Sequence, residues 1–509
     1  MNGPKVVRAL SPDFAFTADP ANLNGPGDLV LGRAGGAGLM AAVTDARGAT
    51  TIEPELARAA PSVSRDGRTY TFELRPGLRF SSGEPVTAEA VRYSIERAVS
   101  PKLLNHYCRD AVLGDVVGED AYEAGKADSI SGIAVRGERV TITLAAPSPT
   151  LPARLTNPCL SVVPPGTPNI PVGLHRPIPS AGPYYIDSFV RGRQLVLRRN
   201  PHYAGPRPQA LDALIAGGGI APAEGGARVE RGSADYAADP GSPPTPAFAE
   251  GGRYERSFGS AGGRLRYVRP PSVVSGFILF NTRRGIFRSP ELRRAANLAI
   301  DRAALVRSGG GEARSLLIPP GVPGYRDAQA YPLHPDLERA RALARGRGGS
   351  AVLALPAERQ EFKPVARQLR DDLARIGVDV RLRPLADPAA AAADPSQSID
   401  AVLDGWAPDY PDPFGVVNLI LQPGVRLPFF PDFFGERRWV RRLEQAAAAP
   451  LERRDAVYAK LDADLARGPA PFAVLGSPPG VGQLLSARLG CERFAYGLID
   501  FASLCVDGE

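Results

Sequence analysis

The chain has 509 residues, of which 44% are hydrophobic and 23% charged, so a chain that is disordered throughout is excluded and about three domains are expected. The formal net charge is +7, but the basic residues, mostly arginine, are scattered among acidic ones without the basic stripe of a nucleic-acid surface, and we expect no nucleic-acid partner. No stretch approaches the about 18 consecutive apolar residues of a membrane-spanning helix.

Alternating apolar and polar residues predict half-buried strands at 69–74 and 140–144, and residues 184–199 are predicted to form a hairpin around a short turn at 191–193. After the first strand, Thr87 stands at the position of an N-cap, and Val91 and Ile95 belong to the apolar stripe of a helix. Residues 217–263 are rich in glycine, proline, alanine and serine, and we expect a variable surface region or linker there.

In the second half, a continuous apolar run at 277–281 predicts a strand that is buried on both faces. Ser289 as N-cap predicts a helix through Ile300, and Asp301 is expected to cap the next helix. Beyond residue 349, strands and helices alternate, which is typical of an α/β unit. The expected elements are strands at 351–355, 378–382 and 401–403, a helix between the first two that ends at Gly377, helices near 437–449 and 451–467, and short strand-like pieces from 482 onward.

The sequence contains no motif of catalysis or cofactor binding. It has no GxSxG, GxxxxGK[ST] or HExxH pattern and no GxGxxG after a strand, so we expect no enzyme activity and no cofactor. The four histidines, at positions 106, 175, 202 and 334, are far apart, and we expect no metal site. The four cysteines lack CxxC spacing, which argues against a zinc ribbon or redox motif and is compatible with two disulfides.

Four segments carry a resemblance to a known family. They are the strand, turn and helix of 69–99, the hairpin of 180–204 with PYYIDSF and RRNPHY, the run FNTRRGIFRSPELRRAANLAIDR in 280–303, and DGWAPDYPDPF in 404–414. Together, in this order and at this spacing, they resemble the extracytoplasmic solute-binding proteins of ABC importers, in particular the large oligopeptide/dipeptide/nickel-binding family. The resemblance spans nearly the whole chain.

The resemblance implies a fold of the periplasmic-binding-protein type, α/β in class, in which two lobes close on a ligand like a hinged trap. Mapped onto this chain, the first lobe takes residues 1–270, with an extra subdomain inserted at about 45–170. The second lobe takes 271–480, and residues 481–509 return to the first lobe.

The implied function is capture of a peptide or peptide-like solute, without catalysis, by a monomer that serves an ABC permease and ATPase complex. An oligosaccharide, a nickel chelate or haem are alternative solutes, because the contents of the cleft vary within the fold. The alternative function is that of an intracellular ligand-sensing or biosynthetic protein that reuses the same fold.

The resemblance also implies which residues bind the ligand, since relatives that take peptides hold the backbone as an added strand and pair its terminal charges. Asp409 matches the acidic residue that receives the peptide α-ammonium; the alternative is a turn residue before Pro411. Arg359 lies near the position of a carboxylate-binding arginine in dipeptide-binding relatives; the alternative is a solvated surface arginine. Trp406 is expected to line the cleft or to pack in the lobe core, and Asn281 to offer a cleft amide or to form a turn.

The compartment follows from the same resemblance, and the disulfides are a separate prediction. The sequence shows no secretion signal and no lipid-anchor cysteine, and we expect a signal that has been removed and an extracytoplasmic protein, anchored to the membrane or at the cell surface; the cytoplasm is the alternative. The preferred disulfide pairs are Cys491 with Cys505 in the strand-like tail and Cys108 with Cys159 in the first lobe.

Overall fold

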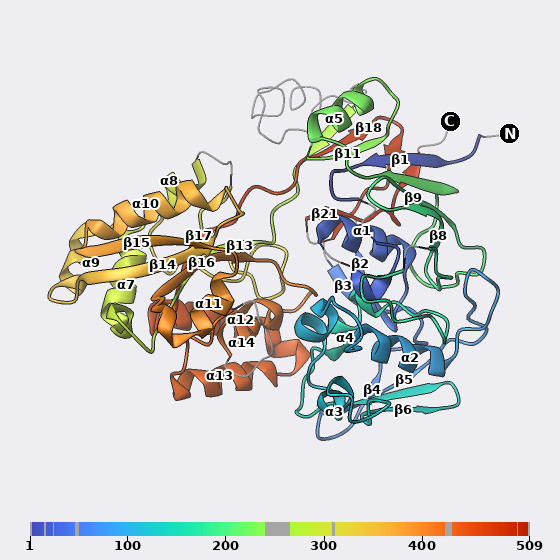
Figure 1. Ribbon diagram of the computed structural model, residues 1–509, viewed down its shortest axis with the longest axis horizontal. Coiled ribbons are helices and arrows are strands. Elements are labelled where there is room, and N and C mark those ends of the chain that lie inside the picture. The colour runs from blue at the N-terminus through green and yellow to red at the C-terminus, as the bar shows by residue number, and fades with distance from the viewer. Residues whose placement is uncertain are drawn as a thin grey trace. The chain divides into compact units, whose positions relative to one another are not determined.

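The computed structural model describes residues 3–14, 17–23, 25–45, 50–174, 176–239, 265–307, 311–422, 430–495 and 497–506. Residues 240–263, which form most of the glycine- and proline-rich stretch, and His175 lie outside the described residues. The chain divides into two compact units (Figure 1). Unit 1 consists of Met1–Pro270 and Val481–Glu509, and unit 2 consists of Pro271–Gly480.

Unit 1 is built around a seven-stranded mixed sheet with the strand order β12-β18-β11-β1-β10-β9-β8. The central strand β1 is parallel to β10 and β11, and the remaining strand pairs are antiparallel. The C-terminal segment joins this sheet through β18. The strands are β1 (Val6–Leu10), β8 (Tyr184–Val190), β9 (Gln194–Arg199), β10 (Ala213–Gly217), β11 (Tyr236–Ala238), β12 (Leu265–Val268) and β18 (Gln483–Ser486).

Smaller elements surround this sheet. A four-stranded antiparallel sheet has the order β4-β5-β7-β6, and unit 1 also contains three two-stranded pairs: β2 with β3, β19 with β22, and β20 with β21. These strands are β2 (Met40–Thr44), β3 (Thr50–Pro54), β4 (Ser62–Val63), β5 (Thr69–Glu73), β6 (Ile133–Arg136), β7 (Arg139–Thr143), β19 (Leu489–Gly490), β20 (Phe494–Ala495), β21 (Leu498–Ile499) and β22 (Cys505–Val506). The helices are α1 (Pro26–Gly35), α2 (Ala88–Ala98), α3 (Glu119–Glu123), α4 (Leu151–Arg154) and α5 (Pro222–Glu230).

The expectation of a linker over 217–263 is wrong for its described part. Helix α5 follows β10, and β11 lies inside the sheet between β1 and β18. The small residues of this stretch permit close packing: a Cβ added at Gly225 would come within 3.3 Å of the Ala237 methyl group. The low side-chain volume therefore lets a helix approach a strand closely, as a tightly packed interior requires.

Unit 2 contains a five-stranded sheet of the order β15-β14-β16-β13-β17. β14 is parallel to β15 and β16, whereas β13 is antiparallel to both β16 and β17. The carboxyl ends of β14, β15, β16 and β17 therefore share one edge of the sheet with the amino end of β13. The strands are β13 (Ser275–Phe280), β14 (Gly349–Pro356), β15 (Val378–Leu385), β16 (Ala401–Trp406) and β17 (Phe472–Gly476).

Helices flank the sheet of unit 2, with α10 on one side and α12, α13 and α14 on the other (Figure 1). They are α7 (Pro290–Ala299), α8 (Arg302–Arg307), α9 (Leu337–Ala344), α10 (Phe362–Ala374), α11 (Pro388–Ala393), α12 (Phe414–Leu421), α13 (Arg437–Ala447) and α14 (Leu451–Arg467). The core lies between these layers, and Phe277 and Phe280 of β13 are fully buried in it. Among the described helices, none combines the length and the apolar character that crossing a membrane requires.

Helices α2 and α7 begin at the N-cap residues that the sequence predicts. The Thr87 hydroxyl accepts a hydrogen bond from the Ala90 N–H at 3.2 Å at the start of α2. The Ser289 hydroxyl accepts one from Leu292 N–H at 3.2 Å at the start of α7. Each cap satisfies a backbone donor that has no partner within its helix.

Two disulfides join Cys108 with Cys159 and Cys491 with Cys505, the same pairs that are preferred from the sequence. Their Cα atoms are 5.9 and 5.4 Å apart, within the usual range of disulfides. Both lie in unit 1, and the second links β22 to the residue that follows β19, the strand with which β22 pairs. The tail of the chain is thus covalently closed after it has entered the large sheet through β18.

Candidate functional site

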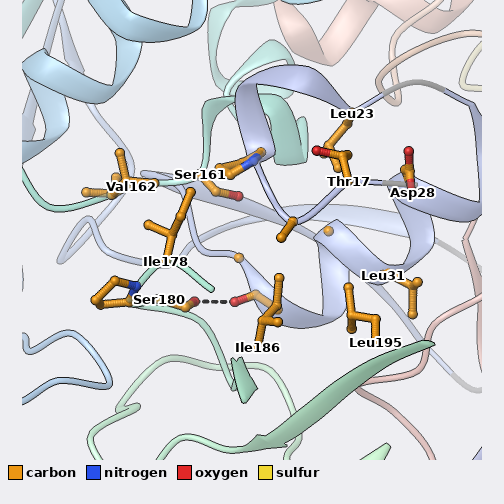
Figure 2. A pocket seen from close by; sticks show the side chains of 17 residues that line it. Thr17, Leu23, Asp28, Leu31, Ser161, Val162, Ile178, Ser180, Ile186 and Leu195 are labelled. Carbon is orange, nitrogen blue, oxygen red and sulfur yellow. Dashed lines mark hydrogen bonds between the residues drawn. The ribbon is translucent and has the colours of Figure 1, made fainter. Parts of the chain in front are cut away.

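A pocket in unit 1 lies between α1, the segment around Ser161 and strands β8 and β9 (Figure 2). Its volume is about 50 Å³, and aliphatic side chains such as Leu31 and Leu195 line it. The Ser180 hydroxyl beside it donates a hydrogen bond to the Gly35 carbonyl oxygen. Since one water takes about 30 Å³ in the liquid, this space is too small for a peptide.

A larger cavity of about 470 Å³ lies in unit 2, between Gly276 and Gly405 on the strands and Leu305, Phe362 and Val365 on helices α8 and α10. We call it the edge cavity, because it lies at the sheet edge where β16 and β17 end. This is the edge at which open α/β sheets bind ligands. Its volume falls within the roughly 300–1,000 Å³ of small-molecule sites, so it is the candidate ligand site of unit 2.

Arg359 lines the edge cavity as part of a charged cluster. Its Nε donates to Oε1 of Glu361 at 2.9 Å, and its Nη1 donates to Oδ1 of Asp404 at 3.4 Å. The guanidinium also stacks on Phe362, with Cζ 4.3 Å from the ring centroid. One cation therefore meets two carboxylates. The Arg359 side chain is 46% exposed, so the cluster lies where the cavity reaches water.

Asp404 is the inner member of this cluster. Burial raises the pKa of its carboxyl, although the Gly405 N–H donates to Oδ1 at 2.7 Å and the Arg359 charge acts in the opposite direction. The Gly405 N–H and the Arg359 guanidinium therefore both favour the charged form of Asp404 at the end of β16.

Trp406 packs against the core of unit 2. Its Nε1 donates to the Gly415 carbonyl oxygen at 2.9 Å, and its ring meets Phe430 edge to face, with centroids 5.2 Å apart. Asp409 follows three residues later and is half-buried. Neither of these two residues is part of the lining of the edge cavity.

Asn281 lies directly after β13, at the opposite edge of the sheet from the edge cavity. Its Nδ2 donates to the Ile399 carbonyl oxygen at 3.3 Å, and its Oδ1 accepts from the Arg283 N–H at 3.1 Å. The Oδ1 of the amide thus serves the turn, which is the second of the two roles considered from the sequence, and the Nδ2 ties the turn to the segment before β16.

The residues of the edge cavity and its cluster that the sequence patterns did not single out include Gly276, Glu361, Asp404 and Gly405. The last two directly precede Trp406 in the DGW motif, so the motif itself was a signal for them. Glu361 and Gly276 had no such signal, because their roles depend on a tertiary contact and on strand register. Within the described ranges, no three His, Cys, Asp or Glu side chains are grouped as metal ligands are.

Comparison with protein-family models matches residues 51–426 to the bacterial extracellular solute-binding proteins, family 5. A probable D,D-dipeptide-binding periplasmic protein, DdpA of Escherichia coli K12, is 25% identical over 386 residues, which are 73% of this chain and 68% of that protein. A probable di/tripeptide-binding protein of Pseudomonas aeruginosa is 26% identical over 408 residues, 72% of this chain and 70% of that protein.

Solved structures extend the likeness to the whole fold. The clavulanic acid biosynthesis oligopeptide binding protein 2 has a TM-score of 0.81 at 21% identity, covering 98% of this chain and 95% of that one. The protein DppA from Helicobacter pylori, in complex with the peptide STSA, has a TM-score of 0.72 at 19% identity, covering 99% and 98%. These likenesses confirm the two-lobed α/β fold that the sequence motifs imply.

Proposed function

Because the chain belongs to the bacterial extracellular solute-binding proteins of family 5, we propose that it captures a peptide or peptide-like solute for an ABC importer. The observation that carries the proposal is the family match over residues 51–426. The peptide class is supported by relatives that are named for a D,D-dipeptide and for di- and tripeptides. The activity is binding without chemical conversion.

In this proposal the lobes enclose the ligand when they close, and its backbone is held as an added strand. Asp409 receives the α-ammonium of the ligand, since a charged terminus that leaves water needs a partner of opposite charge. Trp406, the last residue of β16, keeps this end of the strand in place through Gly415 and Phe430. Arg359 is not assigned a ligand carboxylate, because its guanidinium already contacts two carboxylates.

The importer's permease and ATPase are the proposed protein partners, and we place the protein outside the cytoplasm, anchored to the membrane or at the cell surface. The two disulfides of unit 1 support this location, because disulfides persist in oxidising compartments and are rare in the cytosol.

Thermal unfolding of the purified protein against ligand panels tests the proposed function. The panels are di-, tri- and tetrapeptides, oligosaccharides, and nickel with chelators. A bound peptide at a hundredfold excess over its Kd should stabilise the folded state by about 2.7 kcal/mol, visible as a rise in Tm that saturates with concentration. A saturable rise with sugars or chelates and none with any peptide would contradict the peptide class. Calorimetric titration of the positive peptides gives the Kd values.

A further inference from the structure

The floor of the edge cavity is formed by glycines that stand in register on neighbouring strands. Gly276 of β13 pairs with Gly405 of β16 on one side and with Gly476 of β17 on the other. Directly paired residues of adjacent antiparallel strands present their side chains on the same face of a sheet. Three strands in a row therefore carry no side chain at this point, and all three glycines line the edge cavity.

At two of these positions, neither the backbone conformation nor a close backbone contact requires a glycine. A Cβ added at Gly276 would have the Gly476 carbonyl oxygen as its nearest neighbour, at 3.5 Å, and one at Gly405 would have a Val274 methyl group, at 3.4 Å. These are ordinary van der Waals distances, and neither residue has a positive φ. Gly476 differs, because its φ is +144° and a Cβ there would meet the Glu312 carbonyl oxygen at 2.3 Å. Glycine inside a strand weakens it and often marks a place where a ligand approaches closely.

The walls facing this floor are apolar. Leu305 of α8, Phe362 and Val365 of α10, and Leu475 of β17 supply most of them. The charged side chains at the cavity, Arg359, Glu361 and Asp404, are already paired with one another, at 2.9 Å between Arg359 and Glu361 and 3.4 Å between Arg359 and Asp404. A ligand charge brought among these walls would lose its hydration without gaining a free partner of opposite sign, which is unfavourable.

We propose that the edge cavity receives one uncharged apolar side chain of the ligand, and that Gly276 and Gly405 set the size of the side chain that fits. This inference rests on the proposed function, because the side chain is taken to belong to a captured peptide. The space suffices for a large aromatic group: a dry cavity of about 150 Å³ in another protein already binds benzene, and the edge cavity measures about 470 Å³.

The test compares trialanine with tripeptides in which one alanine at a time is replaced by Phe, Leu, Lys or Glu. By calorimetry, Phe at one position should bind about tenfold to a hundredfold more tightly than Ala, from the usual gain on burying such a side chain. Lys or Glu at that position should show no such gain. Gly405→Leu, which places a leucine side chain inside the cavity, should lower the ratio of the trialanine Kd to the Kd of the Phe peptide, because the space left for the Phe side chain is smaller.

Gly276→Ala is the second variant, because its one added methyl group would lie at an ordinary van der Waals distance, 3.5 Å, from its nearest neighbour and should reduce the preference for Phe only in part. Ala374→Leu, on the exposed end of α10, is the matched control and should leave all affinities unchanged. Equal affinities of wild type for trialanine and all Phe peptides, or equal weakening of both by Gly405→Leu, would overturn the proposal.

Indole serves as a probe that does not depend on peptide binding. Wild type should bind indole saturably in an NMR titration, and Gly405→Leu should bind it more weakly. Failure of every peptide to bind would contradict the proposed function. Identical indole titrations of wild type and Gly405→Leu would overturn the apolar pocket, whatever the peptides do.

Discussion

Arg454 of α14 donates two hydrogen bonds to the carboxylate of Asp412, Nε to Oδ2 at 2.7 Å and Nη2 to Oδ1 at 2.9 Å, and both side chains are buried. The Arg454 Nη1 also donates to the carbonyl oxygen of Ala447 at the end of α13. The second aspartate of the APDYPDP motif is thereby joined to two helices of unit 2. This holds the loop in which Asp409 lies, three residues earlier.

Asp412→Asn should therefore destabilise unit 2 strongly. The substitution keeps the size of the side chain but leaves the Arg454 guanidinium buried without a counter-charge, which costs about 3–5 kcal/mol. Chemical unfolding followed by circular dichroism measures this loss. Lys460→Gln is the control, because Lys460 pairs with Asp464 while 73% exposed, and an exposed pair contributes at most about 1 kcal/mol. Equal losses in both variants would show that the buried pair has no special role.

Asp409→Asn should weaken binding of peptides with a free amino terminus by about tenfold to a hundredfold, the usual range for a hydrogen bond to a charged group. The variant should bind N-acetylated peptides as wild type does, because these lack the ammonium. Titration calorimetry of both peptide forms on both proteins gives the comparison. Asp371→Asn, on the exposed side of α10, controls for the change of net charge. A loss of the same size for acetylated peptides would assign Asp409 to the turn alone.

Arg359→Gln tests the charged cluster at the edge cavity. Since Glu361 and Asp404 already compensate the guanidinium, the variant should change the affinities for free-acid and C-terminally amidated peptides by the same factor. The measurement is the ratio of the two Kd values in wild type and variant. A selective loss for the free acid would assign to Arg359 the carboxylate-binding role that the resemblance implies.

Local structure could be predicted where one residue and its sequence neighbours determine it. Thr87 and Ser289 cap their helices because each hydroxyl reaches an N–H three residues ahead. Gly377 ends its helix with a φ of +80°, which favours glycine. The strand at 277–281 was visible because an apolar run without alternation indicates burial on both faces.

The edge cavity could not be predicted, because it depends on contacts between distant segments. Gly276 and Gly405 become neighbours only through the register of β13 with β16. Arg359 and Asp404 meet only because β14 and β16 are adjacent. The linker expected from the glycine content of 217–239 was wrong for a related reason. Glycine content predicts loops from local sequence alone, whereas Gly225 allows α5 to pack closely on Ala237.

The two disulfides should stabilise unit 1 by different amounts. In the loop-entropy account, the bridge Cys491–Cys505, with a separation of 14 residues, contributes about 3 kcal/mol, and Cys108–Cys159, with a separation of 51, contributes somewhat more. Paired Cys→Ser variants measured by chemical unfolding without reductant should show these losses. Thiol titration of the denatured, unreduced wild type should find no free thiol, and four after reduction; four free thiols before reduction would contradict both bridges.

Glu119 of α3 makes the stability of unit 1 depend on pH. Burial raises the pKa of its carboxyl to about 7, although Oε2 accepts from the Gly114 N–H at 2.9 Å. In the unfolded chain the group titrates near its usual value of about 4.3. Between these two values the folded state binds more protons, so the free energy of unfolding should rise as the pH falls from about 7 to about 4.5.

The size of this effect is on the order of 3 kcal/mol, at about 1.4 kcal/mol for each pH unit between the two pKa values. Glu119→Gln removes the titration, so the stability of the variant relative to wild type should be greater at pH 8 than at pH 5 by about this amount. Guanidinium chloride unfolding at several pH values measures the difference. Glu89→Gln, which is exposed, is the control. The buried Asp462, whose pKa burial raises to about 6, also makes stability depend on pH, but it contributes equally to wild type and to Glu119→Gln. A difference in unfolding free energy between these two proteins that does not vary with pH would therefore show that Glu119 titrates alike in the folded and unfolded states.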